Sequence, residues 1–454
     1  MIRKLLIANR GEIAVRIIRA CREMGIATVA VYSEADEESL HTQLADEAIC
    51  IGPGPSAKSY LNMEQIISAT MVSGADAIHP GFGFLSENAR FAELCEKCGI
   101  TFVGPPSKVI RMLGNKKIAR STMIAAGVPV VPGSEGDVED IETGLKEAER
   151  IGYPVIIKAA LGGGGKGMRV ANTPEEFPEA YATARKESEI AFGDGTMYIE
   201  HFVVNPRHIE FQILADSFGN VIHLGERDCS IQRNHQKMIE ESPSAAVSPE
   251  LREKMGHAAV TAAKAAGYVN AGTIEFLLEP DGKFWFMEMN TRIQVEHPVT
   301  EWVTGIDLVK EQLKIASGMP LEISQEDVRI MGHAIECRIN AENPQKNFRP
   351  SPGTIQGAHF PGGNGIRVDT CVYNGCKIPP YYDSMLAKLI VHAGNRKEAI
   401  AKMQSALGEV IIDGIDTNID YQYEILKDED YQSGNFDTGF LASHIIAGVK
   451  INEN

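Results

Sequence analysis

The chain has 454 residues, too many for one ordinary hydrophobic core, and its length predicts two to four domains. Hydrophobic residues make up 44% and charged residues 23%, a balance typical of globular proteins that excludes a disordered chain. The formal net charge of −17 excludes a nucleic-acid-binding surface, because nucleic-acid phosphates bind to basic surfaces. An anionic substrate must therefore meet a local cluster of cations.

Eight cysteines are scattered along the chain without the spacing of a disulfide framework, which predicts a reducing, cytoplasmic compartment. Cys95 and Cys98 form a C-x-x-C pair, but no second pair follows at zinc-like spacing. Two thiols on one helical turn are therefore favoured over a zinc site. The apolar stretch 5–8 is too short for a signal peptide, and no run reaches transmembrane length, so we expect no membrane segment.

The first part of the chain alternates predicted strands with predicted helices. The predicted strands cover residues 3–8, 27–32, 48–51, 77–80 and 101–103. A helix begins near Ile13, and two more cover residues 63–71 and 88–98. This alternation predicts a parallel α/β sheet.

The middle of the chain changes character after the prolines and glycines of residues 128–136, which mark a boundary. Short strands joined by glycine turns follow from residue 153 to about 203. Further strands are predicted at 208–215, 273–278 and 283–289, with a helix at 249–266 before the last two. A final α+β unit begins after Met331 and contains a helix at 396–407.

A glycine-rich loop follows the predicted strand that ends at Lys158, and residues 168–171 predict a return strand. The glycines let backbone N–H groups turn inward around an anion, while Lys158 and Lys166 supply positive charge. Gly167 follows Lys166 and no helix comes next, so this is not a P-loop. A flexible linker is the alternative, which the flanking strands and lysines disfavour. The pattern predicts a lid over phosphates.

Asp281 and Gly282 are a strong hairpin signal. A symmetric register around this turn places Glu275 opposite Glu288, with Asn290 two residues further along the same face. Opposed carboxylates repel each other, and a divalent cation between them removes that cost. Oxygen ligands suit Mg²⁺, with nucleotide phosphates completing its shell. Two solvated glutamates are the alternative, which the neighbouring aromatic residues disfavour.

Charged and amide residues alternate with apolar ones directly after this hairpin. Arg292, Gln294 and Glu296 are expected to face the metal from a strand-like segment. Arg292 can hold a carboxylate-like anion in a bidentate fork, and Glu296 beside it can act as a general base. A surface ion pair is the alternative.

A second dense polar run lies upstream. It contains Arg227, Asp228, Ser230, Gln232, Arg233, His235 and Lys237. A solvated loop is the plain interpretation, but a chain with this negative net charge concentrates cations here, where triphosphate and bicarbonate can bind.

These segments together resemble the biotin carboxylase family of the ATP-grasp superfamily, over nearly the whole chain. The most specific stretches are HPGFGFLSEN, GYPVIIKAALGGGGKGMR, ERDCSIQRNHQKMIEE, EMNTRIQVEHPVTE and HAIECRINAE, between IANRGEIAVRIIRA near the start and PPYYDSMLAKLI near residue 390. The resemblance implies an α/β and α+β ATP-grasp fold with a Rossmann-like parallel-sheet domain at 1–113. An ATP-grasp domain at 114–330 then contains a mobile glycine-rich lid at 135–203, and an α+β domain covers 331–446.

The resemblance also implies the site residues. The ATP-binding residues are Lys116, Lys158, Gly163, Gly164, Gly165, Lys166, Gly167, Glu200, His201, Val203, His208, Gln232, His235, Glu275, Leu277 and Glu288. The metal ligands are Glu275, Glu288 and Asn290, and the bicarbonate-binding residues are Lys237, Arg292, Gln294, Val295 and Glu296. The biotin-binding residues are Phe82, Gly83 and Arg338, and the catalytic residues are Glu296, Arg338, Lys237 and Arg292.

Two residues depart from the family's usual pattern. Phe82 stands where the family often has Tyr, which removes a hydroxyl near biotin. His201 stands where it often has Lys, and a histidine is largely neutral at cytoplasmic pH.

The activity that the resemblance implies is ATP- and bicarbonate-dependent carboxylation of biotin through carboxyphosphate, with Mg²⁺ or Mn²⁺. No Met-Lys-Met attachment sequence occurs, so a separate biotin carboxyl carrier protein and carboxyltransferase subunits are expected, as in the first half-reaction of acetyl-CoA carboxylase in fatty acid biosynthesis. A homodimer with Arg19 and Glu23 at its interface is also implied. The alternatives are another acyl-CoA or 2-oxo acid as acceptor, another ATP-grasp ligase, and a non-catalytic ATP-sensing protein.

Overall fold

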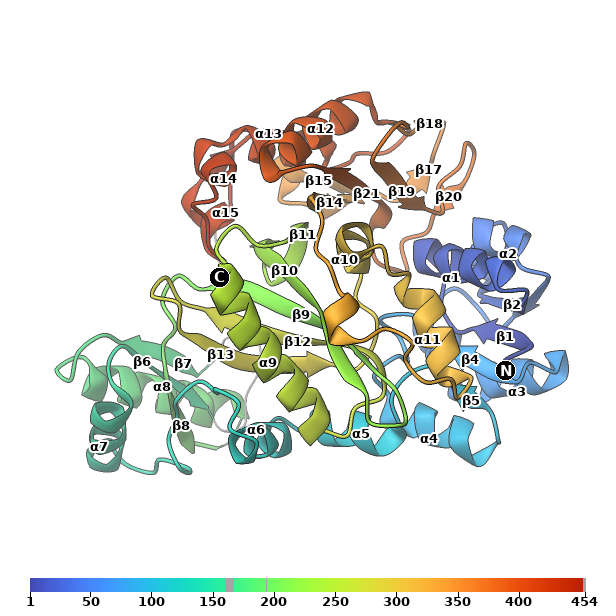
Figure 1. The fold of residues 1–454 in the computed structure, drawn as a ribbon. Helices are drawn as coiled ribbons and strands as arrows, with labels where there is room; N and C mark the ends of the chain where they lie inside the picture. The colour runs from blue at the N-terminus through green and yellow to red at the C-terminus, as the bar shows by residue number, and fades with distance from the viewer. Residues whose placement is uncertain (160–166, 193, 452–454) are drawn as a thin grey trace. The chain divides into compact units, whose positions relative to one another are not determined.

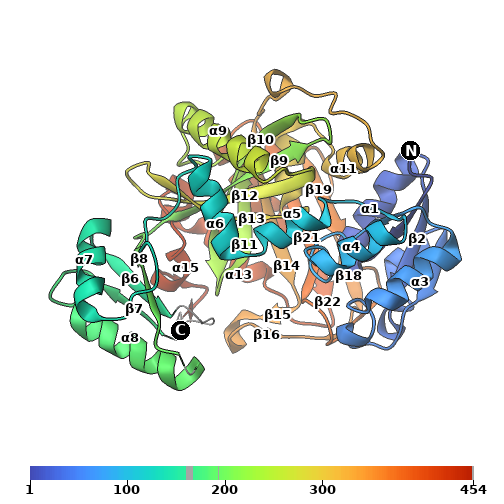
Figure 2. The same cartoon turned by 90° about the horizontal axis from the view of Figure 1, so that it is seen from below.

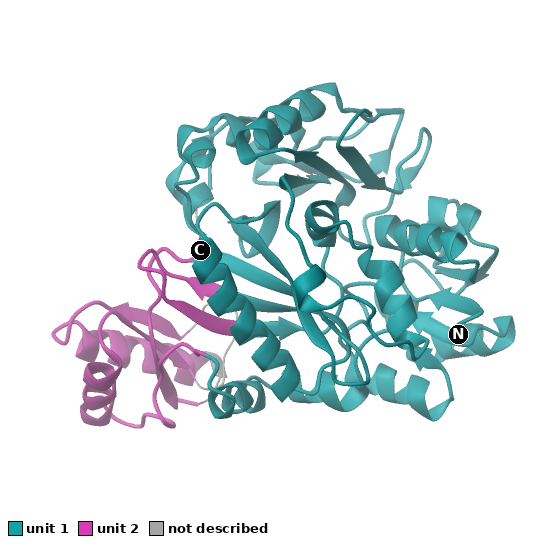
Figure 3. Cartoon of the chain, viewed as in Figure 1, with its two compact units in different colours: residues 1–128, 207–276, 288–451 teal, residues 129–206, 277–287, 452–454 magenta. Residues whose placement is uncertain are grey.

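The computed structural model of the chain describes residues 1–159, 167–192 and 194–451 (Figure 1). The predicted loop residues Gly163, Gly164, Gly165 and Lys166 lie outside these ranges. The described residues form two compact units, coloured separately in Figure 3. Unit 1 comprises residues 1–128, 207–276 and 288–451, and unit 2 comprises residues 129–206 and 277–287.

A parallel five-stranded sheet in unit 1 has the strand order β3-β2-β1-β4-β5. Its strands are β1 (Lys4–Ile7), β2 (Ala27–Tyr32), β3 (Glu47–Cys50), β4 (Ala77–His79) and β5 (Thr101–Phe102). The helices α1 (Gly11–Glu23), α3 (Met63–Ser73) and α4 (Ala89–Lys97) lie between successive strands. Consecutive residues of β1 are fully buried, as expected for a strand covered on both faces. The predicted parallel α/β sheet is confirmed.

An eight-stranded sheet joins the middle and the C-terminal part of the chain in the order β13-β12-β9-β10-β11-β14-β21-β19. Its strands are β9 (Arg207–Ala215), β10 (Val221–Arg233), β11 (Gln236–Ser242), β12 (Asn270–Leu278), β13 (Phe284–Asn290), β14 (His333–Asn340), β19 (Ile366–Thr370) and β21 (Met385–Ala393). The neighbouring pairs β9–β10, β10–β11, β11–β14, β14–β21 and β21–β19 are antiparallel.

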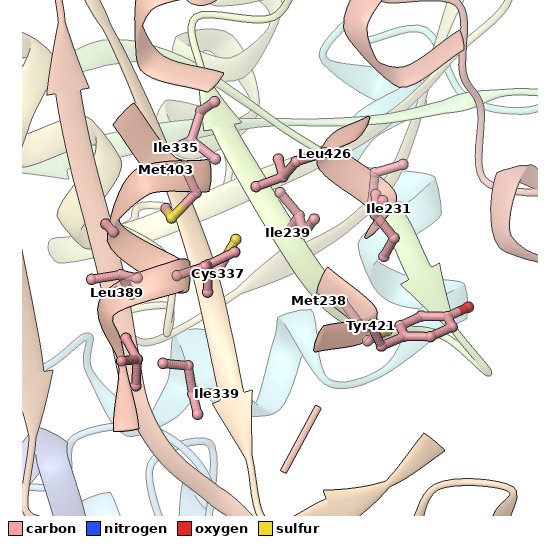
Figure 4. Close-up of a cluster of buried hydrophobic side chains, with 14 of the residues drawn as sticks. Ile231, Met238, Ile239, Ile335, Cys337, Ile339, Leu389, Met403, Tyr421 and Leu426 are labelled. Atoms are coloured by element: carbon pink, nitrogen blue, oxygen red, sulfur yellow. The ribbon is translucent and has the colours of Figure 1, made fainter. Parts of the chain in front are cut away.

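Strand β14 shows how this sheet separates an apolar face from a polar one. Ile335, Cys337 and Ile339 point into the hydrophobic core of Figure 4, which includes residues of α12 (Arg396–Glu409) and α13 (Ile419–Lys427). The intervening residues Glu336 and Arg338 therefore face the other side. This polar side carries the candidate site.

A β-bulge in β10 determines to which face of the sheet the later side chains of that strand point. His223 pairs with Ile213, but after Gly225, which has a φ of 83°, Arg227 pairs with Glu210. The extra residue in β10 moves every later side chain to the opposite face. Without it, Arg227 would lie opposite Ile209.

Unit 2 contains a three-stranded antiparallel sheet of β7 (Met168–Ala171), β6 (Val155–Ala159) and β8 (Met197–His201). The helices α7 (Ile141–Ile151) and α8 (Phe177–Phe192) pack beside it (Figure 2). The antiparallel pairing of β6 with β7 confirms the predicted return strand. The predicted domain limits, including the lid at 135–203, remain predictions.

The remaining elements connect or flank these sheets. The further helices are α2 (Leu40–Leu44), α5 (Ser107–Leu113), α6 (Lys116–Ala125), α9 (Pro249–Ala265), α10 (His297–Thr304), α11 (Leu308–Ala316), α14 (Glu429–Ser433) and α15 (Phe440–Ser443). The short strands are β15 (Glu342–Asn343), β16 (Arg349–Pro350), β17 (Gly353–Thr354), β18 (Gly357–His359), β20 (Lys377–Ile378), β22 (Ile411–Asp413), β23 (Ile445–Ile446) and β24 (Val449–Lys450). Within the described ranges, every helix is too short or too polar to cross a membrane.

Two local predictions were wrong. The turn after β12 is closed by the Glu279 N–H, which donates to the Lys283 carbonyl at 2.8 Å, so its loop has three residues and not the predicted two. Residues 291–296 form no strand, because Glu296 is the N-cap of α10 and the chain turns there into a helix. The polar run at residues 227–237 is a β-hairpin of β10 and β11, not the solvated loop that was its alternative interpretation.

Candidate active site

Lys237 lies at the centre of the polar cluster in unit 1. Its Nζ is 2.6 Å from Glu210 Oε2, 2.6 Å from Glu296 Oε1 and 3.1 Å from Glu275 Oε1. Burial alone would lower the pKa of this ammonium group, but the surrounding carboxylates, together with Cys229, raise it well above its usual value. Lys237 is therefore a permanent cation that binds carboxylates from three segments of the chain.

Glu296 is held between two cations. Its second oxygen, Oε2, lies 3.0 Å from an Arg338 guanidinium nitrogen, which is also 2.5 Å from Glu240 Oε1. Burial of Glu296 favours the neutral acid, but Lys237, Arg338 and Arg227 outweigh this effect and hold the pKa of Glu296 well below its usual value. Glu296 is thus a buried, ionised carboxylate.

Asn290, Arg292 and Gln294 surround Glu275. The amide nitrogens of Asn290 and Gln294 donate to Glu275 Oε1 at 2.8 and 3.1 Å. Arg292 in turn donates to Gln294 Oε1 at 2.6 Å and to Asn290 Oδ1 at 3.1 Å. The side chains of residues 290, 292, 294 and 296 therefore converge as predicted, although the backbone that carries them is not a strand.

The second oxygen of Glu275 lies 2.9 Å from His208 Nε2. Burial raises the pKa of Glu288, and the negative charge of Glu275 raises it further. This electrostatic effect means that the two carboxylates are neighbours, and a divalent cation between them would relieve their repulsion. The donor set of Glu275, Glu288 and Asn290 consists of oxygen ligands and fits Mg²⁺.

The β10–β11 hairpin brings the cations of the polar run to the cluster. Asn234 and His235 at its turn both have positive φ, 49° and 62°, as a tight hairpin turn requires. Gln232 therefore pairs directly with Lys237. Arg227 lies further along β10, where its guanidinium donates to Glu210 at 2.5 Å and to Gln212 at 2.8 Å.

Lys116, Phe82 and Gly83 are further predicted site residues of unit 1. Lys116, the first residue of α6, is exposed and lowers the pKa of Glu288 electrostatically. Phe82 packs against the core of the N-terminal sheet, and its carbonyl accepts a hydrogen bond of 2.7 Å from Asn9. Gly83 follows with a φ of 68°.

Unit 2 carries its own predicted residues. Val155 and Ile157 of β6 face the helices, whereas Lys158 and Glu200 on the other face form an ion pair. His201 Nε2 lies 3.6 Å from Glu279 Oε1, and the imidazole meets the Trp285 ring edge-on. Gly167, whose carbonyl accepts a hydrogen bond from the Ala159 N–H, borders the loop. Val203 lies two residues after the end of β8, and Leu277 is the penultimate residue of β12.

Sequence reasoning missed Glu210, Glu240 and Lys388. The first two carboxylates bind Lys237 and Arg338, and all three side chains are fully buried. Lys388 lies inside β21, whose other residues are apolar apart from His392, and a charged residue at such a position was the available signal. Glu210 and Glu240 lie in strands that carry several other polar residues, so no such signal marked them.

Three protein-family models match the chain. They are the biotin carboxylase N-terminal domain over residues 1–110, the ATP-binding domain of the carbamoyl-phosphate synthase L chain over residues 115–324, and the biotin carboxylase C-terminal domain over residues 336–443.

Curated relatives match over their full length or most of it. Biotin carboxylase 1 of Bacillus subtilis is 60% identical, covering 99% of this chain and 100% of the relative. A pyruvate carboxylase subunit from Methanothermobacter thermautotrophicus is 54% identical, covering 97% of this chain and 90% of the relative.

Solved structures also match nearly the whole chain. The biotin carboxylase domain of a thermophilic 2-oxoglutarate carboxylase bound to bicarbonate has 51% identity and a TM-score of 0.94, with 98% of each chain covered. A biotin carboxylase–β,γ-ATP complex from Campylobacter jejuni has 50% identity and a TM-score of 0.89, covering 98% of this chain and 99% of that one.

Proposed function

The chain belongs to the biotin carboxylase family of ATP-dependent ligases, and from this premise we propose that it uses MgATP and bicarbonate to carboxylate biotin on a separate carrier protein. The observation that carries the proposal is the Glu296 carboxylate, which is buried and ionised between Lys237 and Arg338 at 2.6 and 3.0 Å. A base next to two cations suits an anionic substrate that must lose a proton.

Glu296 is the general base of the first step. It takes the hydroxyl proton of bicarbonate, and the bicarbonate oxygen attacks the γ-phosphorus of ATP as the bond to ADP breaks. Lys237 and Arg292 stabilise the negative charge that develops, and Gln294 and the main chain of Val295 orient bicarbonate. The product is carboxyphosphate.

In the second step the C–O bond of carboxyphosphate breaks, which gives CO₂ and phosphate. Phosphate takes the proton of the ureido nitrogen of biotin, and that nitrogen attacks CO₂. Arg338 stabilises the negative charge on the ureido oxygen, with Phe82 and Gly83 as further biotin contacts.

The nucleotide is assigned to the residues that the family resemblance implies. They are Lys116, Lys158, Gly163, Gly164, Gly165, Lys166, Gly167, Glu200, His201, Val203, His208, Gln232, His235, Glu275, Leu277 and Glu288. Glu275, Glu288 and Asn290 would hold Mg²⁺ or Mn²⁺, which neutralises phosphate charge when bound. A solved structure of the biotin carboxylase domain of Hydrogenobacter thermophilus 2-oxoglutarate carboxylase, in complex with MgADP, ADP and bicarbonate, supports this assignment.

Acetyl-CoA carboxylase is the proposed setting, with a biotin carboxyl carrier protein, carboxyltransferase subunits and a homodimer in which exposed Arg19 and Glu23 of α1 lie at the interface. The relatives named biotin carboxylase support it, and the free cysteines support a cytoplasmic location. The relatives from pyruvate and 2-oxoglutarate carboxylases support a 2-oxo acid as the other candidate acceptor. Sedimentation at twice the mass of one chain would support the dimer.

Phosphate release from MgATP by the purified chain tests the activity. The expected result is release that requires bicarbonate and increases with free biotin. Release indifferent to both would favour another ATP-grasp ligase, and no release would favour a non-catalytic protein.

A further inference from the structure

Lys388 is a fully buried cation in the middle of β21. Its Nζ donates to the Val295 carbonyl at 2.9 Å and lies 3.1 Å from Glu12 Oε1 and 3.8 Å from Asp369 Oδ2. Lysine is seldom fully buried unless it is paired. Here its hydrogen bond goes to the main chain of the segment that carries the catalytic base.

The register of the sheet places Lys388 beside Arg338. The two residues pair directly across β21 and β14, so both side chains project from the polar face. Arg338 binds the carboxylate of Glu296, and Lys388 binds the carbonyl of the preceding residue. Two neighbouring cations thus hold the side chain and the main chain of one short segment.

The main chain of this segment has further contacts at its two ends, since the Thr291 N–H donates to Glu87 Oε1 at 3.0 Å and His297 Nδ1 lies 2.9 Å from the Gln294 carbonyl oxygen, but it has no secondary-structure ladder. Residues 291–296 belong to no strand or helix, and the Glu296 side chain does not cap α10 although it occupies the N-cap position. Ser, Thr, Asp or Asn at that position would fix the backbone by bonding to the first N–H groups. The hydrogen bond from Lys388 restrains the backbone at Val295, directly before the N-cap position at which no side-chain cap forms.

Opposite charges hold Lys388 in place. Burial raises the pKa of Glu12 to about 7, although Lys388 acts against this. Asp369 is also paired with Arg367 at 2.6 Å, whereas among the described residues Glu12 forms its ion pair with Lys388 alone. Replacing Lys388 alone therefore disturbs charge as well as hydrogen bonding, and the two effects must be separated.

We infer that Lys388 is a positioning residue that fixes the Val295 main chain and thereby aligns Gln294 and Glu296 toward bicarbonate. The inference rests on the proposed function of this segment. Lys388 does not touch the reacting atoms, so its loss acts on the binding of bicarbonate and leaves the nucleotide contacts intact.

Bicarbonate-dependent phosphate release by the full chain tests this. In Lys388→Met we expect the KM for bicarbonate to rise about tenfold or more, with the KM for MgATP changed less than about twofold. A second variant, Glu12→Gln with Lys388→Met, removes both charges and keeps the test available if the single variant fails to fold. We expect its KM for bicarbonate to stay raised.

Lys402 provides a matched control. Its Nζ also donates to main-chain carbonyls, those of Asn364 at 3.0 Å and His392 at 2.6 Å, but neither belongs to the site. Lys402→Met should leave both KM values unchanged. A normal KM for bicarbonate in folded Lys388→Met, or its recovery in the double variant, would overturn the inference. Normal bicarbonate-dependent turnover in Glu296→Gln would instead overturn the proposed base and would leave the Lys388 result readable.

Discussion

Glu296 combines two properties that oppose each other, full burial and a negative charge. Lys237 and Arg338 make this possible, since each binds one carboxylate oxygen. We predict that Glu296→Gln lowers bicarbonate-dependent phosphate release at least about 100-fold, because an amide cannot accept the proton. The Glu296→Gln variant should still bind MgATP, as measured by titration calorimetry. Glu326→Gln, at an exposed glutamate of the same unit, should keep full turnover. Near-normal turnover in Glu296→Gln would remove its assignment as the base.

Glu336 is a different kind of buried acid. Among the described residues, neither of its carboxyl oxygens has a hydrogen-bond partner, and burial raises the pKa of the group well above its usual value. Between the unfolded pKa of about 4.3 and this raised value, only the folded state keeps the proton. The contribution of Glu336 to the free energy of unfolding therefore decreases as the pH rises through this window.

Glu336→Gln removes this dependence, because the amide stays neutral at every pH. We predict that the melting temperature of the variant, relative to the original chain, increases between pH 5 and pH 8. Scanning calorimetry at both pH values measures the difference. If the difference in melting temperature between the variant and the original chain were the same at both pH values, Glu336 would be ionised in the folded protein.

Several residues of the site were predictable from the sequence for physical reasons, and others were not. The spacing of Arg292, Gln294 and Glu296 brought their side chains together even though the predicted strand was wrong. Glu210 and Glu240 were missed, because each lies in a strand with several other polar residues and is recognised as part of a site only when its cation is known. Lys237 and Arg338 come from strands that pair across the sheet, and local patterns do not contain that pairing.

At the scale of elements, local signals predicted the strands and helices but not how they register. The bulge at Gly225 is an example, because one extra residue decides that Arg227 faces Glu210 rather than Ile209. A glycine inside a strand permits a bulge but does not specify it. The helix α10 begins at Glu296 and His297 although the preceding residues alternate like a strand, and Pro298 in its first turn was the available signal.

The pairing of β14 with β21 depends on Gly332, directly before β14. This glycine has a φ of 67°, and a Cβ added there would lie 2.3 Å from the Ala393 carbonyl oxygen. We predict that Gly332→Ala destabilises the fold by more than about 2 kcal/mol, since backbone strain and a main-chain clash add. Gly219→Ala is the matched control, because its φ of 95° is also positive but nothing lies within 4 Å. Equal losses of melting temperature would mean that the close approach costs nothing.

At the scale of the whole molecule, composition and alternation predicted the parallel N-terminal sheet and the mixed fold. They did not predict that strands from the middle and from the C-terminal part share one eight-stranded sheet, since that contact joins residues about a hundred positions apart. The shared sheet explains how Lys237 and Arg338 reach one carboxylate. The net charge of −17 fits this arrangement, because the cations that anionic substrates need are concentrated on one polar face.

The most direct test of the account is the transfer of isotopically labelled carbon from bicarbonate to free biotin by the purified chain. We predict label in carboxybiotin only when MgATP is present, and none with Glu296→Gln. Hydrolysis of ATP without any labelled biotin, under conditions in which the chain is folded and binds MgATP, would contradict it.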